Sequence, residues 1–405
     1  MALSSAARVF YLNLKKSSSL LASTRICVVQ TANLTSKENR DPDYKRPKPW
    51  PYETKYYSFL WGYVEGTVKR FDENTKIVVV DGNIGAGKSA FAKQLAEAFD
   101  LVYFPEPTME PFYVTPYGYD IRLLDDIVPP SYKACDLKTF YSNPHHRNVA
   151  QFQFRMFMFR YEQYIDALAH VLNTGQGVVM ERSVYGDFVF METMHKFGYI
   201  SDPVRQLYKD INENTLDELL RPHLIVYLDV SPEVCLQRIK ERNDPTEVNS
   251  KVLTKEYLET LEHYYKHHYL KKLERHTEIL IYDWNNFGDV EVVVEDIERI
   301  DFERYSRYDF KLQDWRKADD WEWNYFRRQY TTHKNKLLIY SHIFRPKVSE
   351  VHHPPDEVIE YRELLEKIPG EMYEEGFNPN AGDNVWFKTD HKGFRYMPII
   401  RYRKE

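Results

Sequence analysis

The sequence has few cysteines, no long apolar run and no excess of positive charge. Its three cysteines (Cys27, Cys135 and Cys235) are too few for a disulfide framework and lack the paired spacing of a zinc site. We therefore expect reduced, structural thiols. No window approaches the roughly 18 apolar residues of a membrane-spanning helix. The formal net charge of −6 disfavours a general nucleic-acid-binding protein, which needs a basic surface.

Acidic residues are absent from the first 37 positions, a stretch rich in serine. The five basic residues there are Arg8, Lys15, Lys16, Arg25 and Lys37. This composition is typical of a mitochondrial transit peptide, so we expect residues 1–37 to be one and to be cleaved. A secretory signal is disfavoured because two lysines interrupt the apolar stretch that it would need. The alternative is a terminus without a targeting role.

Between residues 76 and 283, apolar runs alternate with helical stretches, which predicts an α/β domain with a parallel sheet. The expected strands are 76–81, 101–105, 177–181, 223–229 and 277–282. The expected helices are 88–99, 150–172, 203–218, 232–242 and 255–272. The runs KIVVVD, GVVM and LIVYLD are nearly continuous, as in strands that helices cover on both faces.

The segment DGNIGAGKSA has the spacing of a phosphate-binding loop, G-x-x-x-x-G-K-S, between an expected strand and an expected helix. Its glycines allow backbone N–H groups to converge on an anion at the positive end of that helix. We expect Lys88 to reach the terminal phosphates and the Ser89 hydroxyl to bind Mg²⁺. The predicted nucleotide-binding residues are Gly82, Gly85, Ala86, Gly87, Lys88 and Ser89. The alternative is a glycine turn without a ligand.

Charged residues follow the second and third expected strands, at the sheet edge where ligands bind in open α/β folds. Glu106 could accept a proton from a hydroxyl that attacks a γ-phosphate. Glu181, Arg182 and Asp187 come directly after a buried strand and need partners, which Mg²⁺ and a phosphate would supply. The alternative for these three residues is an ordinary surface turn. Gln153, on an expected helix, could present its amide to a base edge or be a solvated glutamine.

In order and spacing, these segments resemble the deoxyribonucleoside kinase family over roughly residues 76–282. The shared features are the phosphate-binding loop, E-P after the second strand, Y-x-x-P before an F-Q helix, E-R-S-x-Y-x-D after the third strand, and SPEVCLQRI. The resemblance implies a P-loop kinase fold with a five-stranded parallel sheet and flanking helices. It assigns Glu106 as the base, and Glu181 and Arg182 as the metal- and phosphate-handling pair. The implied nucleoside pocket is Tyr141 (with a one-residue shift), Gln153, Arg160 and Asp187.

The lid segment RIKERNDPTE, residues 238–247, departs from the family pattern R-x-x-x-R-x-R-x-E-E. Arg238 and Arg242 match, but Asp244 stands at the third arginine position and Pro245 follows it. An arginine on a transferring phosphoryl group contributes on the order of 10³-fold or more in rate. A carboxylate facing a triphosphate therefore predicts retained phosphate binding and lost transfer, and the proline predicts an extended Asp244. The alternative is a variant lid that still catalyses.

Two further segments flank the kinase-like region. Residues 38–75, rich in proline and charge, predict an extended arm with a short amphipathic helix near residues 57–68. Residues 284–405 form an extension with 12 aromatic residues between positions 301 and 350. So many aromatic side chains must be buried against their own domain or against another protein.

Together, the leader, the kinase-like core, the altered lid and the aromatic extension resemble the kinase-like accessory subunits of mitochondrial respiratory complex I, the NADH:ubiquinone oxidoreductase. That resemblance implies a non-catalytic subunit that supports assembly and stability of the complex during electron transport. It implies a peripheral position on the matrix side of the inner membrane, against other subunits of the membrane arm. The alternative is an active mitochondrial deoxyribonucleoside kinase.

The ligand implied by this resemblance is a nucleotide in the former kinase site. Descriptions of such subunits name both a purine nucleotide and FAD. The phosphate-binding loop favours a nucleoside di- or triphosphate with Mg²⁺, and the sequence has no flavin-specific motif.

Overall fold

The computed structural model describes residues 33–41, 43–115, 117–342, 348–368, 373 and 377–383. Of the predicted leader, residues 1–37, only residues 33–37 are described, and Cys27 lies outside the described residues. The centre of the structure is a five-stranded sheet in the order β2-β3-β1-β4-β5, with parallel pairing throughout. The strands are β1 Ile77–Gly82, β2 Val102–Phe104, β3 Val178–Glu181, β4 Leu224–Asp229 and β5 Glu278–Asp283. The predicted fold class is confirmed, and every expected strand is present within two residues of its predicted ends.

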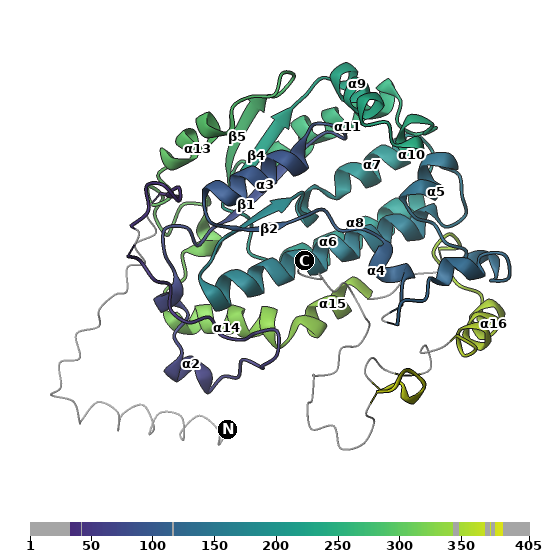
Figure 1. Ribbon diagram of the computed structural model, residues 1–405, viewed down its shortest axis with the longest axis horizontal. Helices are drawn as coiled ribbons and strands as arrows, with labels where there is room; N and C mark the ends of the chain where they lie inside the picture. The colour runs from purple at the N-terminus through teal and green to yellow at the C-terminus, as the bar shows by residue number, and fades with distance from the viewer. Residues whose placement is uncertain are drawn as a thin grey trace, which may run out of the picture.

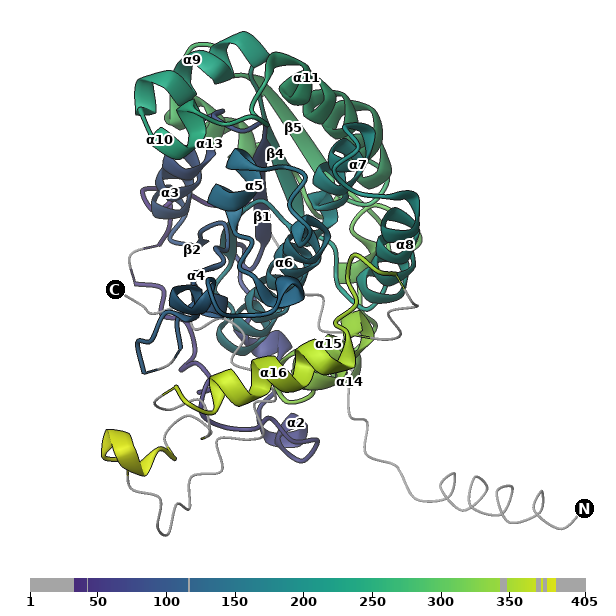
Figure 2. The ribbon, with the colours of Figure 1, turned by 90° about the vertical axis from the view of Figure 1, so that its right-hand side faces the viewer.

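Helices surround the sheet. Those of the kinase-like region are α3 Lys88–Ala98, α4 Glu110–Tyr113, α5 Leu137–Ser142, α6 Val149–Thr174, α7 Phe188–Lys196, α8 Asp202–Leu216, α9 Pro232–Arg242, α10 Pro245–Val248, α11 Lys255–Tyr264 and α12 Leu270–Leu273. Those of the arm and the extension are α2 Trp61–Val64, α13 Val290–Glu298, α14 Asp320–Thr331, α15 Lys334–His342 and α16 Pro355–Leu365. In the turned view, α3 and α13 lie on one side of the sheet, and α7, α8 and α11 lie on the other (Figure 2).

The composition of the strands explains why the sheet is enclosed. All six residues of β1 and all four of β3 are buried, as are the first five of β4. These near-continuous apolar runs suit parallel strands that helices cover on both faces. Cys135 and Cys235 are buried and free, as predicted. Within the described residues, no helix combines the length and the apolar character needed to cross a bilayer.

Two helix predictions were wrong in extent. The helix expected over 255–272 is interrupted by a π-helical turn at Tyr265–Tyr269, between α11 and α12. The helix expected near 57–68 is limited to the four residues of α2, none of which is buried. Gly62 and Gly66 weaken helix formation there. In addition, the Asp320 carboxylate accepts hydrogen bonds from the N–H groups of Thr67 and Val68 at 2.9 and 3.0 Å, so these N–H groups are not available to extend the helix.

The arm and the extension pack onto the kinase-like region. α14 runs alongside α6 (Figure 1), and its Arg327 is fully buried. Arg327 Nε donates to Asn173 Oδ1 on α6 at 2.8 Å, and its NH1 group donates to the Glu65 carbonyl of the arm at 3.1 Å. Its guanidinium also lies 3.9 Å from the ring centre of Tyr57. One side chain thus joins three segments that are distant in sequence.

Replacing Arg327 with methionine should lower the free energy of unfolding by about 2–4 kcal/mol, because the buried Asn173 Oδ1 loses its donor and the Glu65 carbonyl loses one of its two donors. Urea unfolding measures this loss. Arg328→Met is the matched control, since this neighbour is only partly buried and should cost about 0.5 kcal/mol or less. Equal losses for the two variants would show that Arg327 does not join the segments as described.

Candidate functional site

The phosphate-binding loop connects the end of β1 to the first residue of α3. Gly82, Gly85 and Gly87 have φ angles of 154°, 80° and 92°, which only glycine adopts without strain. A Cβ on Gly82 would lie 2.7 Å from the Leu228 carbonyl oxygen, and one on Gly85 would lie 2.9 Å from the Cys235 carbonyl oxygen. The loop therefore has the backbone of an anion-binding nest at the positive end of a helix.

Lys88 and Ser89 begin α3 at this loop. Lys88 is buried, and its Nζ donates to the Asn83 carbonyl at 2.8 Å. Burial is the main cause that lowers the pKa of Lys88 to about 8. Ser89 Oγ donates to Glu181 Oε1 at 2.8 Å, and the Tyr103 hydroxyl donates to Glu181 Oε2 at 3.0 Å. The two residues predicted to bind Mg²⁺ thus lie together at the head of the helix.

Glu106 lies between two arginines, just beyond the end of β2. Its Oε1 is 2.6 Å from an Arg160 NH2 group on α6, and its Oε2 is 3.0 Å from Arg182 Nε after β3. Arg160 also pairs with Asp187, whose Oδ2 accepts from Gln153 Nε2 at 2.9 Å and from the Tyr208 hydroxyl at 2.6 Å. We call this group of six residues the rim network; its members are Glu106, Gln153, Arg160, Arg182, Asp187 and Tyr208. It contains five of the residues predicted from the sequence.

The electrostatics of Glu106 follow from this position. Burial raises the pKa of Glu106, but Arg182 and Arg160 outweigh burial and lower the pKa to about 2. A general base works best when its pKa lies near the working pH. The Glu106 carboxylate is therefore ionised and a weak base at neutral pH, and both of its oxygens are already paired.

Arg182 connects the rim network to the phosphate-binding loop. Its NH1 group donates to the Gly82 carbonyl at 3.1 Å and to the Tyr265 hydroxyl, and lies 3.7 Å from Asp81 Oδ1. The backbone of Arg182 is in the left-handed region at φ 61°, a strained conformation that is frequent at functional sites. The charged residues after β3 were expected to need partners, and Arg182 finds them within the protein itself.

Besides Tyr103 and Tyr208, sequence reasoning missed three members of this site: Asp81, Tyr265 and Tyr269. Asp81, the residue before Gly82, is buried, and its Oδ2 accepts from the Tyr269 hydroxyl at 2.8 Å. Burial raises the pKa of Asp81 to about 6. Tyr265 and Tyr269 both come from the π-helical turn. The available signals were an acid at the end of an apolar strand and two tyrosines four residues apart.

Tyr141 stands apart from these contacts. It is buried on α5, and its carbonyl oxygen accepts from the Lys251 N–H at 2.8 Å. Within the described residues, the hydrogen bonds of the rim network do not include it. Its place in the nucleoside pocket stays a prediction.

Both lid arginines are already bound to groups of the protein. Arg238 donates to the carbonyls of Ala86, Trp284 and Asn285 at 3.1, 2.7 and 3.0 Å, and lies 4.0 Å from the ring centre of Phe287. Its charge is thereby directed at backbone oxygens around the loop. Arg242 is half-exposed and pairs with Glu247 at 3.1 Å.

Asp244 differs from its predicted use. Its backbone is extended, as the following proline requires, but its carboxylate caps α10 by accepting from the Thr246 N–H at 2.8 Å. This hydrogen bond lowers the pKa of the exposed carboxylate. Asp244 was expected to oppose a triphosphate; its charge instead stabilises the start of a short helix. The lid therefore lacks its third arginine without placing a carboxylate against the loop.

Comparison with known proteins matches residues 78–315 to the family described as deoxynucleoside kinase. Deoxyguanosine kinase of Dictyostelium discoideum is 30% identical over 236 residues, which cover 58% of this chain and 73% of the relative.

Two mammalian relatives match a longer part of the chain. Both are named NADH dehydrogenase [ubiquinone] 1 alpha subcomplex subunit 10, mitochondrial. The relative from Mus musculus is 34% identical over 328 residues, covering 80% of this chain and 86% of its own. The relative from Bos taurus is 35% identical over 343 residues, covering 83% and 94%. The chain belongs to the deoxynucleoside kinase family and, within it, to the group of these mitochondrial NADH dehydrogenase subunits.

Proposed function

We propose that this chain is a non-catalytic accessory subunit of mitochondrial complex I, which supports assembly and stability of that complex during NADH-to-ubiquinone electron transport. The observation that carries the proposal is the extent of the similarity. The two mammalian subunits align with 80% and 83% of the chain, whereas the Dictyostelium kinase aligns with 58%. The additional alignment means that the chain shares with these subunits more than the kinase-like region alone.

The site geometry supports a role without phosphoryl transfer. The Glu106 carboxylate is held by two arginines at a pKa of about 2, far from the working range of a general base. Of the two lid arginines, one is bound to backbone carbonyls and the other to Glu247. No arginine stands at position 244, where the family supplies one more positive charge.

The same site suits a purine nucleotide with Mg²⁺. The loop and Lys88 would hold the phosphates, while Ser89 and Glu181 offer the oxygen ligands that Mg²⁺ prefers. Protein side chains alone form no cluster of three or more metal ligands among the described residues. Mg²⁺ usually takes only one or two carboxylates, with phosphate and water oxygens completing its shell. A nucleotide that binds only the folded state stabilises that state by mass action.

The proposed placement follows from the same family. Residues 1–37 serve as the transit peptide, residues 38–75 as the arm, 76–283 as the nucleotide-holding domain and 284–405 as an extension for subunit contacts. The mature chain lies peripherally on the matrix side of the inner membrane, against the membrane arm. Support comes from the basic, acid-free leader and from the mitochondrial relatives.

An active mitochondrial deoxyribonucleoside kinase is the second candidate. The observation that favours it is the meeting of Glu106, Arg160 and Arg182 beside the phosphate-binding loop. A nucleoside hydroxyl that separated Glu106 from its arginines would restore a base in reach of the phosphate.

The proposed function predicts that the chain comigrates with complex I when mitochondria of its source organism are solubilised in mild detergent and separated on native gels. Depleting the chain should reduce the amount of assembled complex, because an accessory subunit stabilises its neighbours. Citrate synthase activity serves as the control for mitochondrial content. A chain that migrates only as a small free protein, with complex I unaffected by depletion, would contradict the proposal.

Mg-ATP at about 100 times its dissociation constant should raise the unfolding free energy of the purified mature chain by about 2.7 kcal/mol. Thermal unfolding measures this as a shift in melting temperature. Lys88→Ala should abolish the shift, whereas replacing Lys93, an exposed lysine on the same helix, with alanine should retain it.

When a deoxynucleoside is added together with Mg-ATP, the wild-type chain should form no deoxynucleoside monophosphate. Turnover near the roughly 1 per second of kinases would support the second candidate.

A further inference from the structure

We propose that seven exposed apolar residues of the arm and α14 form a docking surface for another protein subunit, an inference that rests on the proposed function and names its contact site. This aromatic patch consists of Phe59, Leu60, Trp61, Tyr63, Val64, Trp321 and Tyr325. Each of the seven is between 43% and 74% exposed. Trp321 joins the two segments, because its ring centre lies 5.3 Å from that of Phe59 and 4.7 Å from that of Tyr63.

The patch is fixed from beneath, so its exposure does not come from a loose segment. Asn324 Nδ2 donates to the Gly62 carbonyl at 3.2 Å, and a Cβ on Gly62 would lie 2.9 Å from that nitrogen. Asp320 holds the backbone of Thr67 and Val68. A surface ordered before it meets its partner loses less conformational entropy on binding.

The outer face of α14 is unusual for a surface helix. Its inner residues Trp323, Arg327 and Tyr330 are buried, so this face needs no further cover. Trp321 and Tyr325, one turn apart, point outward instead of the polar residues that a solvated helix face carries. The helix therefore carries large aromatic side chains on two sides, and the described residues cover only one of these sides.

The size of the patch fits a protein interface. With roughly 150–200 Å² for a fully accessible large side chain, the seven residues expose about 600–800 Å². Monomeric proteins rarely expose contiguous apolar patches above a few hundred Å². A standard interface buries about 800 Å² on each partner. The exposed area of the patch therefore amounts to most of the area that one partner buries in a standard interface.

The charges around the patch favour a protein partner over a lipid surface. The charged residues that neighbour the patch in the sequence, Glu65, Lys69, Glu322 and Arg328, are of both signs. Anionic membranes attract clusters of basic residues, whereas protein interfaces combine an aromatic centre with a mixed polar rim. We therefore expect a partner subunit with apolar side chains at the centre of its contact surface and charges of both signs around them. The proposed place in a hetero-assembly favours a different chain over a second copy.

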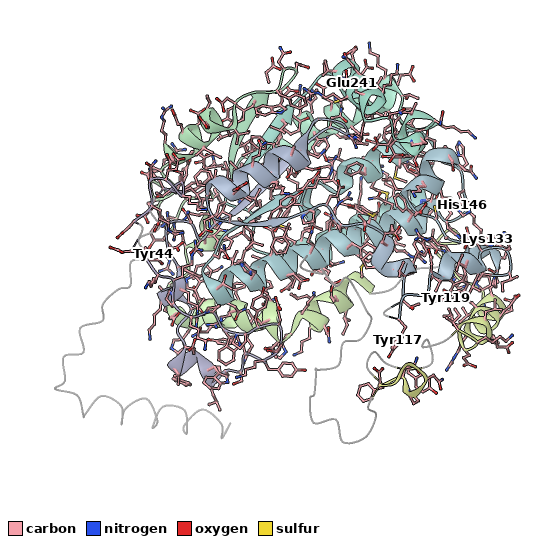
Figure 3. The ribbon with its side chains drawn as sticks, viewed as in Figure 1. Tyr44, Tyr117, Tyr119, Lys133, His146 and Glu241 are labelled. Atoms are coloured by element: carbon pink, nitrogen blue, oxygen red, sulfur yellow. The ribbon has the colours of Figure 1, made fainter. Side chains whose placement is uncertain are left out.

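The patch lies far from the lid. In both ribbon views α2 and α14 are at the bottom of the molecule, and α9 and α10 are at the top (Figures 1 and 2). Glu241, on α9, marks that upper end with its side chain drawn (Figure 3). Docking through the patch would leave the nucleotide site accessible, so the two can be tested separately.

The test expresses the full chain in mitochondria that lack the endogenous protein, as wild type, as the double variant Tyr63→Glu with Trp321→Glu, and as Tyr325→Glu. The Tyr325 ring makes no ring contact with the arm within the described residues, so its replacement should leave the fold intact. Tyr308→Glu is the matched control, because Tyr308 is 88% exposed and outside the patch. The readout is the fraction of the chain that comigrates with complex I on native gels.

We expect about a tenfold or greater loss of comigration for both patch variants and no loss for Tyr308→Glu. The purified variants should retain the melting-temperature shift with Mg-ATP. If the wild type and both patch variants comigrate with complex I to the same extent, the inference is overturned and the proposed function still stands. A wild type that does not comigrate would remove the proposed function, and the inference with it.

Two further measurements on the purified chain separate the other occupants. A patch-dependent dimer in analytical ultracentrifugation at micromolar concentration would assign the surface to a second copy and overturn the inference. Patch-dependent binding to vesicles of phosphatidylcholine and cardiolipin would do the same in favour of a membrane. We expect a monomer that does not bind these vesicles.

Discussion

The double ion pair of Glu106 with Arg160 and Arg182 is the interaction on which the rest of the site depends. It ties the end of β2 to the end of β3 and to α6. Asp187 and Tyr208 extend it to α8, and Tyr265 extends it to the π-helical turn. Charges removed from water are tolerated only when they are paired and hydrogen-bonded, so loss of one member exposes the others to the full cost of burial.

In the proposed function, the pairing of these charges separates phosphate binding from phosphoryl transfer. The loop and the start of α3 are shaped by their own glycine backbone, and Arg182 of the rim network reaches the loop through its hydrogen bond to the Gly82 carbonyl. For phosphoryl transfer, Glu106 would have to act as a base and several lid arginines would have to surround the phosphate. Here Glu106 is fully paired, Arg238 is bound to carbonyls, and Asp244 caps a helix. In the proposed function, the half of a kinase site that binds phosphate is kept, while the groups that a kinase would use for transfer serve the structure.

How much could be predicted from the sequence depended on how local each feature is. The five strands, the phosphate-binding loop and four members of the rim network follow from apolar runs, glycine spacing and short motifs, and the family resemblance adds Arg160. Other features rest on contacts between residues far apart in the chain. Asp320 restricts the helix near Thr67, and Arg327 joins the extension to Asn173. The capping role of Asp244 is a local feature, but it was not predicted, because the resemblance to kinases led us to interpret Asp244 as the replacement of an arginine.

The stability of Glu106→Gln tests the central claim, that the kinase site is now a structural element, most directly. The pKa of Glu106 is lowered from 4.5 to about 2, so its contribution is present above pH 4.5 and is lost as pH falls toward 2. The account predicts that the variant loses about 2–3 kcal/mol in urea unfolding at pH 7, and that the gap narrows below pH 4.5. Replacing a residue retained for catalysis usually leaves stability unchanged or raises it. A variant as stable as wild type, or more stable, at pH 7 would contradict the account.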